Sequence, residues 1–179
     1  ELANFAETFR RMAEQIALSL SAQGTPQTRK ALVQMLASDA TNIYIRDGLI
    51  SGLRGHEIEF LQELSASTDW SSEMPGRATF LKSITKCILA ERNKKQVASL
   101  LDLIAEQSTS DRWRQMAMLD AFPDPARAAH RNRKIVLLDD EPARLLALQA
   151  KFPPPTGAQS GDAAAKMSAD QQMGQRLSR

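Results

Sequence analysis

The sequence is short of cysteine, of aromatic residues and of long apolar runs. Cys87 is the single cysteine among 179 residues, which excludes an internal disulfide and any metal or iron–sulfur site built from several cysteines. No apolar run reaches the roughly 18 residues that predict a transmembrane helix, so we expect no direct membrane insertion. Aromatic residues make up only 5% of the chain and β-branched residues are sparse, a composition that favours helix over strand.

The chain also lacks a strong charge of either sign. Lys and Arg number 23 against 21 Asp and Glu, which gives a net charge of +2, too small to predict nucleic-acid binding. One local basic cluster could meet an acidic surface, although a solvated connector explains it equally well. Aromatic residues that would stack on bases are not interleaved with it, so we expect no nucleic-acid partner. The cluster consists of Arg127, Arg131, Arg133 and Lys134, with Arg112 and Arg114 before it.

Apolar residues recur at steps of three and four along most of the chain, which predicts amphipathic α-helices. The first helix should run from Leu2 to about Leu20, and Thr25-Pro26 should open the second as N-cap and first helical residue. Further helices are expected at about 41–53, 56–67, 77–91 and 94–107, around Trp113, and from 141–142 onward. We therefore predict an all-α protein. The apolar stripe of the first helix is Leu2, Phe5, Phe9, Met12, Ile16 and Leu20.

Two segments of the chain have similar sequence patterns, NIYIRDGLISGL at 42–53 and DRWRQMAMLDAF at 111–122. Aligning Tyr44 with Trp113 gives an offset of 113 − 44 = 69 residues. In both segments small residues lie four apart, Gly48 and Gly52 in the first and Ala117 and Ala121 in the second, a spacing that lets a neighbouring helix approach closely. The same offset gives the pairs Gly48 with Ala117, Leu49 with Met118, Gly52 with Ala121 and Leu53 with Phe122.

Upstream of these segments the offset becomes 81 − 9 = 72, which pairs Phe9 with Leu81, Met12 with Ile84 and Ile16 with Ile88. We interpret the pairs as one three-helix unit present twice, in a short α-solenoid of HEAT or armadillo type. The alternative is that amphipathic helices of similar length share apolar positions by chance. The residues expected to matter most for this fold are Tyr44, Leu49, Leu53, Trp113, Met118 and Phe122.

The domain organisation follows from a change in composition near residue 152. Residues 1–151 are expected to form the helical-repeat domain, and residues 152–179 a linker with the start of a following helix. The stretch PPPTGAQSGDAAAK, at 153–166, has no apolar period, whereas Ser168 and Gln171 fit a capping box. The chain opens in a helix without an initiator Met, which we interpret as a piece of a longer polypeptide.

The segment KIVLLDDEPARLLAL, at 134–148, resembles the opening of a response-regulator receiver domain, where a strand delivers a magnesium-binding acidic pair. By that resemblance the pair would be Asp139 and Asp140. However, only 179 − 133 = 46 residues remain from its start, too few for a receiver domain. We favour the alternative that Asp139, Asp140 and Glu141 cap a helix starting at Pro142, because negative charge stabilises the positive end of a helix dipole.

No other residues form a recognisable reactive constellation. His56 and His130 are far apart in sequence and lack a third ligand at metal-binding spacing. Cys87 lies on the same stripe as Ile84 and Ile88, which predicts a buried, unreactive thiol. We therefore predict no catalytic, cofactor-binding or metal-binding residue, no cofactor, and no enzymatic activity of this chain.

Three segments resemble a known family: IYIRDGLISGLRGHEIEFLQEL, ATFLKSITKCILAERNKKQVASLLDLI and DRWRQMAMLDAF. They resemble the helical-repeat region of membrane-bound dehydrogenases found in Planctomycetes and Verrucomicrobia. In that family a sugar-dehydrogenase-like β-propeller precedes a HEAT-like region, and a c-type haem domain follows it. The end of the chain, SADQQMGQRLSR, is similar to the helix that leads into the CxxCH haem-attachment site, but no CxxCH is present.

The resemblance implies a non-catalytic scaffold within a larger multidomain protein, linking a dehydrogenase-like domain to a c-type cytochrome domain. Those neighbouring domains would be its partners, and other proteins could also bind its helical faces. It further implies a periplasmic or otherwise extracytoplasmic location, although the chain carries no signal peptide. Two alternatives stay open: a truncated receiver beginning at 134–148, and a free-standing helical protein-binding module.

Overall fold

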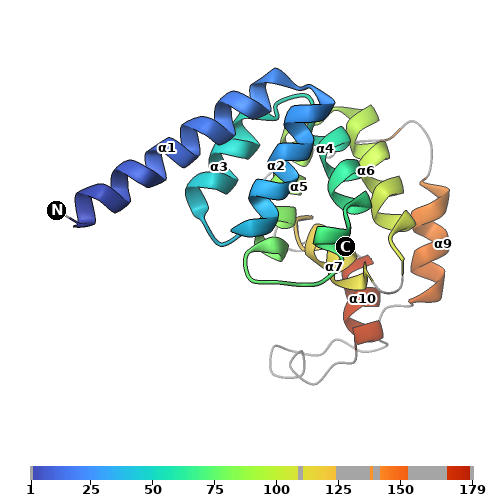
Figure 1. Cartoon of the computed structure of the whole chain (residues 1–179). Helices are drawn as coiled ribbons and strands as arrows, with labels where there is room; N and C mark the ends of the chain where they lie inside the picture. The colour runs from blue at the N-terminus through green and yellow to red at the C-terminus, as the bar shows by residue number, and fades with distance from the viewer. Residues whose placement is uncertain (1, 109–110, 124–137, 139–141, 153–168, 178–179) are drawn as a thin grey trace. The chain divides into compact units, whose positions relative to one another are not determined.

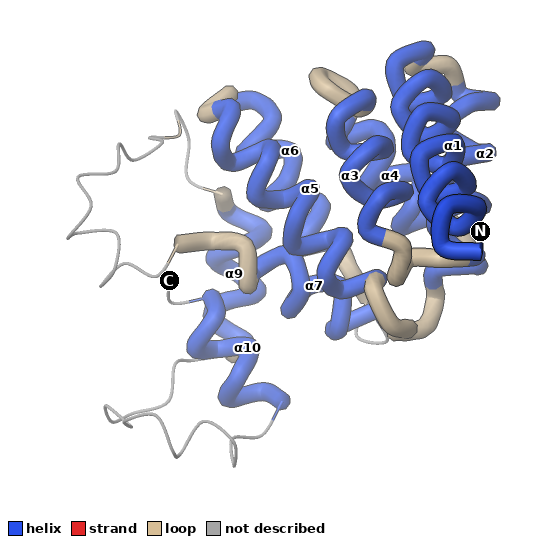
Figure 2. Tube along the Cα trace, turned by 90° about the vertical axis from the view of Figure 1, so that its left-hand side faces the viewer, coloured by secondary structure: helices blue, strands red, loops and turns tan. Residues whose placement is uncertain are grey.

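The computed structural model describes residues 2–108, 111–123, 138, 142–152 and 169–177, without the side chains of 2–7, 9, 10 and 169. Every element in these residues is a helix, and Figure 2 shows no strand among them. The predicted all-α class is therefore confirmed for the described part of the chain. The helices in Figure 1 are α1 (Leu2–Gln23), α2 (Pro26–Ser38), α3 (Ile43–Gly52), α4 (Glu57–Ala66), the 3₁₀ helix η1 (Thr68–Trp70), α5 (Arg77–Glu91), α6 (Lys94–Glu106), α7 (Arg112–Leu119), α9 (Ala143–Lys151) and α10 (Ala169–Leu177).

The chain divides into two compact units, Glu1–Ile84 and Thr85–Arg179, and the boundary lies inside α5. The predicted domain boundary near residue 151 stays a prediction. Most of the predicted linker, at 153–168, lies outside the described residues, as does Ser168 of the predicted capping box. The helix expected to follow is present as α10.

Helix starts are set by side chains that satisfy the first backbone N–H groups. Thr25 caps α2 as predicted: its hydroxyl accepts a hydrogen bond from the Thr28 N–H at 3.2 Å, and Pro26 takes the first helical position. Asn42 caps α3, its side-chain oxygen accepting from the Tyr44 N–H at 3.0 Å. Asn93 caps α6 in the same way. These three helices therefore begin where the sequence supplies an oxygen acceptor.

An aromatic cluster fills the core of the first unit. Phe80 of α5 makes edge-to-face contacts with Phe60 of α4 and with Trp70, at 6.1 Å between ring centroids in both pairs. All three rings are fully buried. The Arg77 guanidinium lies 4.8 Å from the Trp70 ring and donates a hydrogen bond to the Ser72 carbonyl at 3.0 Å. A buried cation is thus accommodated by an aromatic face and a backbone acceptor.

A glycine lets two backbone segments of the first unit meet. Gly76, just before α5, has φ of +86° and lies so close to Ala40 that an added Cβ would sit 2.1 Å from the Ala40 carbonyl oxygen. Only glycine meets both requirements, a left-handed backbone and no side chain. The contact holds the start of α5 against the loop between α2 and α3.

The second unit is built around α6 and α7. Gln115 of α7 is buried and donates to the Ile104 carbonyl of α6 at 3.0 Å. Helix α10 contacts α7, where Arg176 Nε donates to the Asp120 carboxylate at 2.7 Å and Met173 is fully buried. Helix α9 contacts α6 and has no buried residue; Arg144 of α9 pairs with Glu106 of α6.

Several residues paired by the sequence offsets occupy similar environments. Asn42 and Asp111, 69 residues apart, are the N-cap residues of α3 and α7. Gly48 and Ala117 are both buried, as are Leu49 and Met118. Tyr44 and Trp113 are each the second residue of their helix and are half-buried. Of the remaining residues expected to matter for the fold, Leu53 is buried and Phe122 is half-buried.

Candidate interaction surface

The side chains that could react or bind a metal ion are not brought together in the described structure. His56 is exposed at the start of α4, and His130 lies outside the described residues. Cys87 is half-buried rather than buried as predicted, because the apolar side of α5 is centred on its neighbours Ile84 and Ile88. Within the part of the chain that the structure describes, no group of three or more His, Cys, Asp or Glu side chains could hold a metal ion.

The acidic segment at 139–141 lies outside the described residues, so neither its capping role nor its magnesium-binding role is addressed by the structure. Leu138 is the only described residue between 124 and 141, and it is half-buried. Helix α9 follows with Pro142 at its N-cap position, which makes no side-chain capping hydrogen bond. The predicted helix therefore exists, beginning one residue after Pro142.

The basic cluster at 127–134 also lies outside the described residues, but the two arginines before it are described. Arg112 pairs with Asp170 of α10, and its guanidinium lies 4.9 Å from the Phe152 ring. Arg114 is buried, 3.7 Å from the Asp111 carboxylate. Burial lowers the pKa of the Arg114 guanidinium, and the Asp111 carboxylate offsets part of that effect. Both arginines thus serve contacts inside the second unit.

Small residues bring α1 and α3 into close contact. The two helices lie side by side and run in the same direction, since Gly48 approaches Glu14 and Gly52 approaches Ser21 (Figures 1 and 2). A Cβ added at Gly48 would lie 2.7 Å from the Glu14 carbonyl oxygen, and one at Gly52 would lie 1.7 Å from Ser21 Oγ. The prediction that these glycines admit a neighbouring helix is confirmed.

Ser21 makes this close approach compatible with burial. It is fully buried, and its hydroxyl donates to the Ala17 carbonyl one turn earlier, at 2.7 Å. The hydrogen bond satisfies the only polar group of that side chain within α1 itself. Ala17 is buried beside it, so the side of α1 that faces α3 consists largely of small side chains. Large apolar residues of α1 are therefore left for another face.

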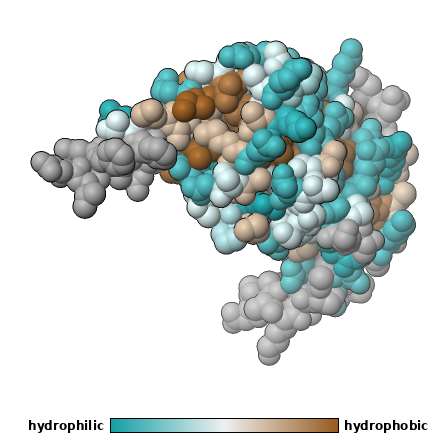
Figure 3. All heavy atoms as spheres, viewed as in Figure 1, coloured by the Kyte–Doolittle hydropathy of each residue, from teal (hydrophilic) through white to brown (hydrophobic). Residues whose placement is uncertain are grey.

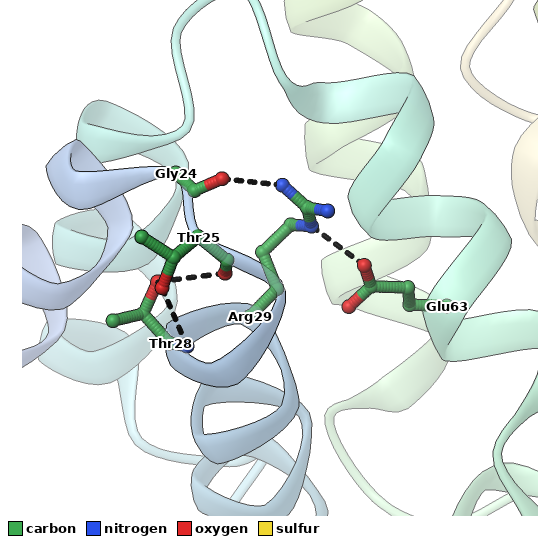
Figure 4. Close-up of polar contacts among 5 residues, drawn as sticks. All are labelled: Gly24, Thr25, Thr28, Arg29 and Glu63. Carbon is green, nitrogen blue, oxygen red and sulfur yellow. Dashed lines mark hydrogen bonds and ion pairs between the residues drawn. The ribbon is translucent and has the colours of Figure 1, made fainter.

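A polar clamp joins α2 to α4 in the same unit. Arg29 donates from Nε to the Glu63 carboxylate at 2.6 Å and from Nη1 to the Gly24 carbonyl at 2.5 Å (Figure 4). The Arg29 side chain is largely buried and Glu63 is partly exposed. Figure 4 also shows Thr25 and Thr28 at the start of α2, where their hydroxyl groups are hydrogen-bonded to each other. The clamp ties the end of the α1–α2 turn to α4, so that it supports α1 without contributing a reactive group.

The apolar stripe of α1 can be followed in the structure through its two described side chains, Met12 and Ile16. We call it the outer seam of α1; its members are Leu2, Phe5, Phe9, Met12 and Ile16. Of the two members whose side chains are described, Met12 is 56% exposed and Ile16 is 48% exposed. Figure 3 shows apolar atoms gathered on the side of this face where α1 lies in Figure 1. Exposed apolar side chains that follow one another along a helix are typical of an interaction surface.

The corresponding stripe of α5 is buried. Leu81, Ile84 and Ile88, the partners of Phe9, Met12 and Ile16 at offset 72, have at most 2% of their area exposed. One turn of α5 can be followed in detail, where Phe80 meets Phe60 and Trp70. The apolar spacing predicted that these residues share a helix face, but it did not reveal that the face of α1 is open. A signal was available: Ala17 and Ser21 lie four apart on the other side of α1, as Gly48 and Gly52 do on α3.

Comparisons with known proteins assign no activity to this surface: neither a family model, nor a curated protein, nor a solved structure matches the chain. No helix among the described residues is both long and apolar enough to span a bilayer. The described residues offer exposed helix faces, and such faces can bind another helix.

Proposed function

We propose that the chain is a non-catalytic helical-repeat scaffold of a larger multidomain protein. The observation that carries the proposal is the correspondence between α1–α2–α3 and α5–α6–α7. The third helices begin at N-caps 69 residues apart, at Asn42 and Asp111, and then place buried residues at matched positions. Repeated helical units of this kind present extended surfaces for other domains, and a repeat array needs no reactive group to do so.

The identity of the linked domains comes from the sequence resemblance. By it, the scaffold joins a dehydrogenase-like domain to a c-type cytochrome domain, in the periplasm or another extracytoplasmic space. Its contribution is geometric: two domains tethered to one support meet at a high effective concentration, so that electrons pass between them without a diffusional search. The chain itself would hold no haem, because it contains no CxxCH motif.

The coding sequence downstream of the Arg179 codon tests this proposal. We expect a Cys-x-x-Cys-His motif within the next few dozen codons, preceded by a continuation of α10. A stop codon directly after Arg179 would contradict the linking role and leave a free-standing module. A run of alternating strands and helices after Arg179 would instead support the receiver interpretation of 134–148, whose strand residues lie outside the described structure.

A second candidate function is a free-standing helical protein-binding module, and the exposed outer seam of α1 favours it. It differs from the scaffold in needing no covalently attached neighbour. Purifying the chain alone and comparing its partners with those of an Ile16→Glu variant would separate the two functions. A scaffold loses no partner on this substitution, whereas a binding module that uses the seam does.

A further inference from the structure

Helix α10 is fastened to α7 at both of its ends. Near its start, Asp170 pairs with Arg112, the first residue of α7. Near its end, Arg176 donates from Nε and Nη2 to the two carboxylate oxygens of Asp120, at 2.7 and 3.4 Å. Between these two pairs, Met173 is fully buried. Two ion pairs and one apolar anchor therefore hold α10 in a single register, with its start near the start of α7 and its end near the end of α7.

The charges on α7 are placed against the dipole of their own helix. Arg112 lies in the first turn of α7 and Asp120 is its C-cap residue, whereas a helix is stabilised by a negative charge at its start and a positive charge at its end. On α10 the order is favourable, with Asp170 in the first turn and Arg176 in the last. Docking therefore brings the charge that suits the dipole to each end of α7. A helix docked in the reverse direction would meet like charges at both ends, so the charges also select the direction.

Helix α10 is too short to be stable by itself. It has nine residues, with Gly174 in its interior, and isolated helices shorter than about 12–15 residues are marginal in water. Its helicity therefore depends on docking. Both ion pairs reach the surface, since the side chains of Asp170 and Asp120 are 67% and 32% exposed. Dissolved salt screens such pairs.

Helix α7 has separate support from α6. Gln115 of α7 is buried and donates to the Ile104 carbonyl of α6 at 3.0 Å, and Leu100 and Ile104 of α6 are fully buried. Short surface segments open at a lower free energy than the core to which they are attached. The loss of α10 should therefore leave α6 and α7 folded.

We propose that α10 is a detachable strap, which folds onto α7 at low ionic strength and leaves it at high ionic strength without unfolding of the second unit. Its release opens the site that Met173 fills. The strap is a conformational device of this chain alone, and the proposal does not depend on which domains the chain links.

Hydrogen exchange of the full chain, followed by mass spectrometry of its peptides, tests the strap. We expect the amides of 169–177 to exchange faster as the salt concentration rises, whereas those of α6 stay protected. Asp120→Lys removes the acceptor of Arg176 and replaces it with a like charge, so exchange in α10 should rise by about threefold or more. A lysine at the C-cap suits the dipole of α7, so α7 itself should stay folded in this variant.

Two further variants make the test specific to the ion pair. Asp102→Lys is the matched control, because it makes the same change of charge at an exposed position of α6 in the same unit. It should leave the exchange of α10 unchanged. The double variant Asp120→Lys with Arg176→Glu restores opposite charges and should recover part of the protection of α10. The recovery is partial because an acidic residue in the last turn of α10 opposes its dipole.

Any of four results would overturn the proposal. One is exchange of α10 at the same rate in Asp120→Lys as in the wild-type chain. Another is exchange of α10 that rises with salt only together with that of α6, which would make α10 part of the core. An equal increase in Asp102→Lys would show that total charge controls α10. A double variant that recovers no protection would show that Asp120 acts on α10 by a route other than its pair with Arg176.

Discussion

Helices α1 and α5 carry the same apolar spacing in opposite environments. Met12 of α1 is 56% exposed, whereas Ile84, its partner at offset 72, is fully buried. Periodicity states which residues share a helix face. It does not state whether the chain supplies another element to cover that face. In α5, the apolar face is covered in part by α4, where Phe60 contacts Phe80. The difference leaves apolar side chains of α1 exposed and makes α5 a core helix.

The largest effect is expected when matched residues of these two helices are replaced and the free energies of unfolding are compared. Ile84→Ala removes fully buried methyl groups and should lower the free energy of unfolding by about 2–5 kcal/mol. Met12→Ala, at the matched position of α1, should cost less than about 1 kcal/mol, because the side chain is already largely in water. Urea unfolding followed by Trp70 fluorescence measures both, in a Trp113→Phe background that leaves one tryptophan in the first unit.

The two variants are compared with the parent chain at the same protein concentration. If Met12→Ala then costs as much as Ile84→Ala, the outer seam is covered within the monomer, and the contrast between the two helices is wrong. If Ile84→Ala is as mild as Met12→Ala, the core of the first unit does not extend to this turn of α5.

The second effect compares Gly52, at the end of α3, with Ala121, which follows α7 at the paired position. Gly52→Ala places a methyl group 1.7 Å from Ser21 Oγ and 2.7 Å from the Leu18 carbonyl oxygen, and should cost about 1–3 kcal/mol through overpacking. Ala121→Gly, at the paired position, removes a methyl group and gains backbone freedom in the unfolded state, so about 0.5–1 kcal/mol is expected. Ser51→Ala, exposed on α3, is the control and should be nearly neutral.

Thermal or urea unfolding of these variants measures the difference directly. A neutral Gly52→Ala would show that α1 can move away from α3 at little cost, and that the close approach is not needed. A double variant Gly52→Ala with Ser21→Ala should recover only part of the loss, since the clash with the Leu18 backbone remains.

Much of the fold could be predicted because local sequence rules decide it. The Thr25-Pro26 start, the bounds of α5 and the glycines of α3 each follow from a residue type at one position. The exposure of Met12 and Ile16 could not be predicted in this way. It depends on which of two faces of α1 meets α3, and that choice is made by Gly48 and Gly52, more than thirty residues away.

The candidate surface escaped prediction for the same physical reason. A stripe of Leu, Phe, Met and Ile predicts burial, and burial is a property of the assembled unit. The core around Trp70 is another long-range feature: a linker-like sequence provides a fully buried ring, held by Arg77. Residues 124–137 and 139–141 lie outside the described structure, so the predictions for the acidic and basic segments stay predictions.

The smallest effect is expected at Asn42 and Asp111, the N-cap residues that the offset of 69 residues pairs with each other. Asn42→Ala removes the acceptor for the Tyr44 and Ile45 N–H groups and should cost about 1 kcal/mol, with little dependence on salt. Asp111, at the paired position, makes no capping hydrogen bond; its carboxylate faces Arg114 at 3.7 Å. Asp111→Asn should therefore cost about 1 kcal/mol or more, and the loss should shrink only partly at high salt, because the Arg114 side chain of the pair is buried.

Urea unfolding at low and high salt distinguishes the two caps. A loss at Asp111→Asn that does not depend on salt would contradict an electrostatic role of the Asp111 carboxylate, since an asparagine there could cap α7 as well as an aspartate. Asn42→Asp should be tolerated within about 0.5 kcal/mol, since both residues are good N-caps. Loss of stability from that exchange would show that the α3 start cannot accept the acidic cap of α7, and that the two copies have diverged in how their third helix begins.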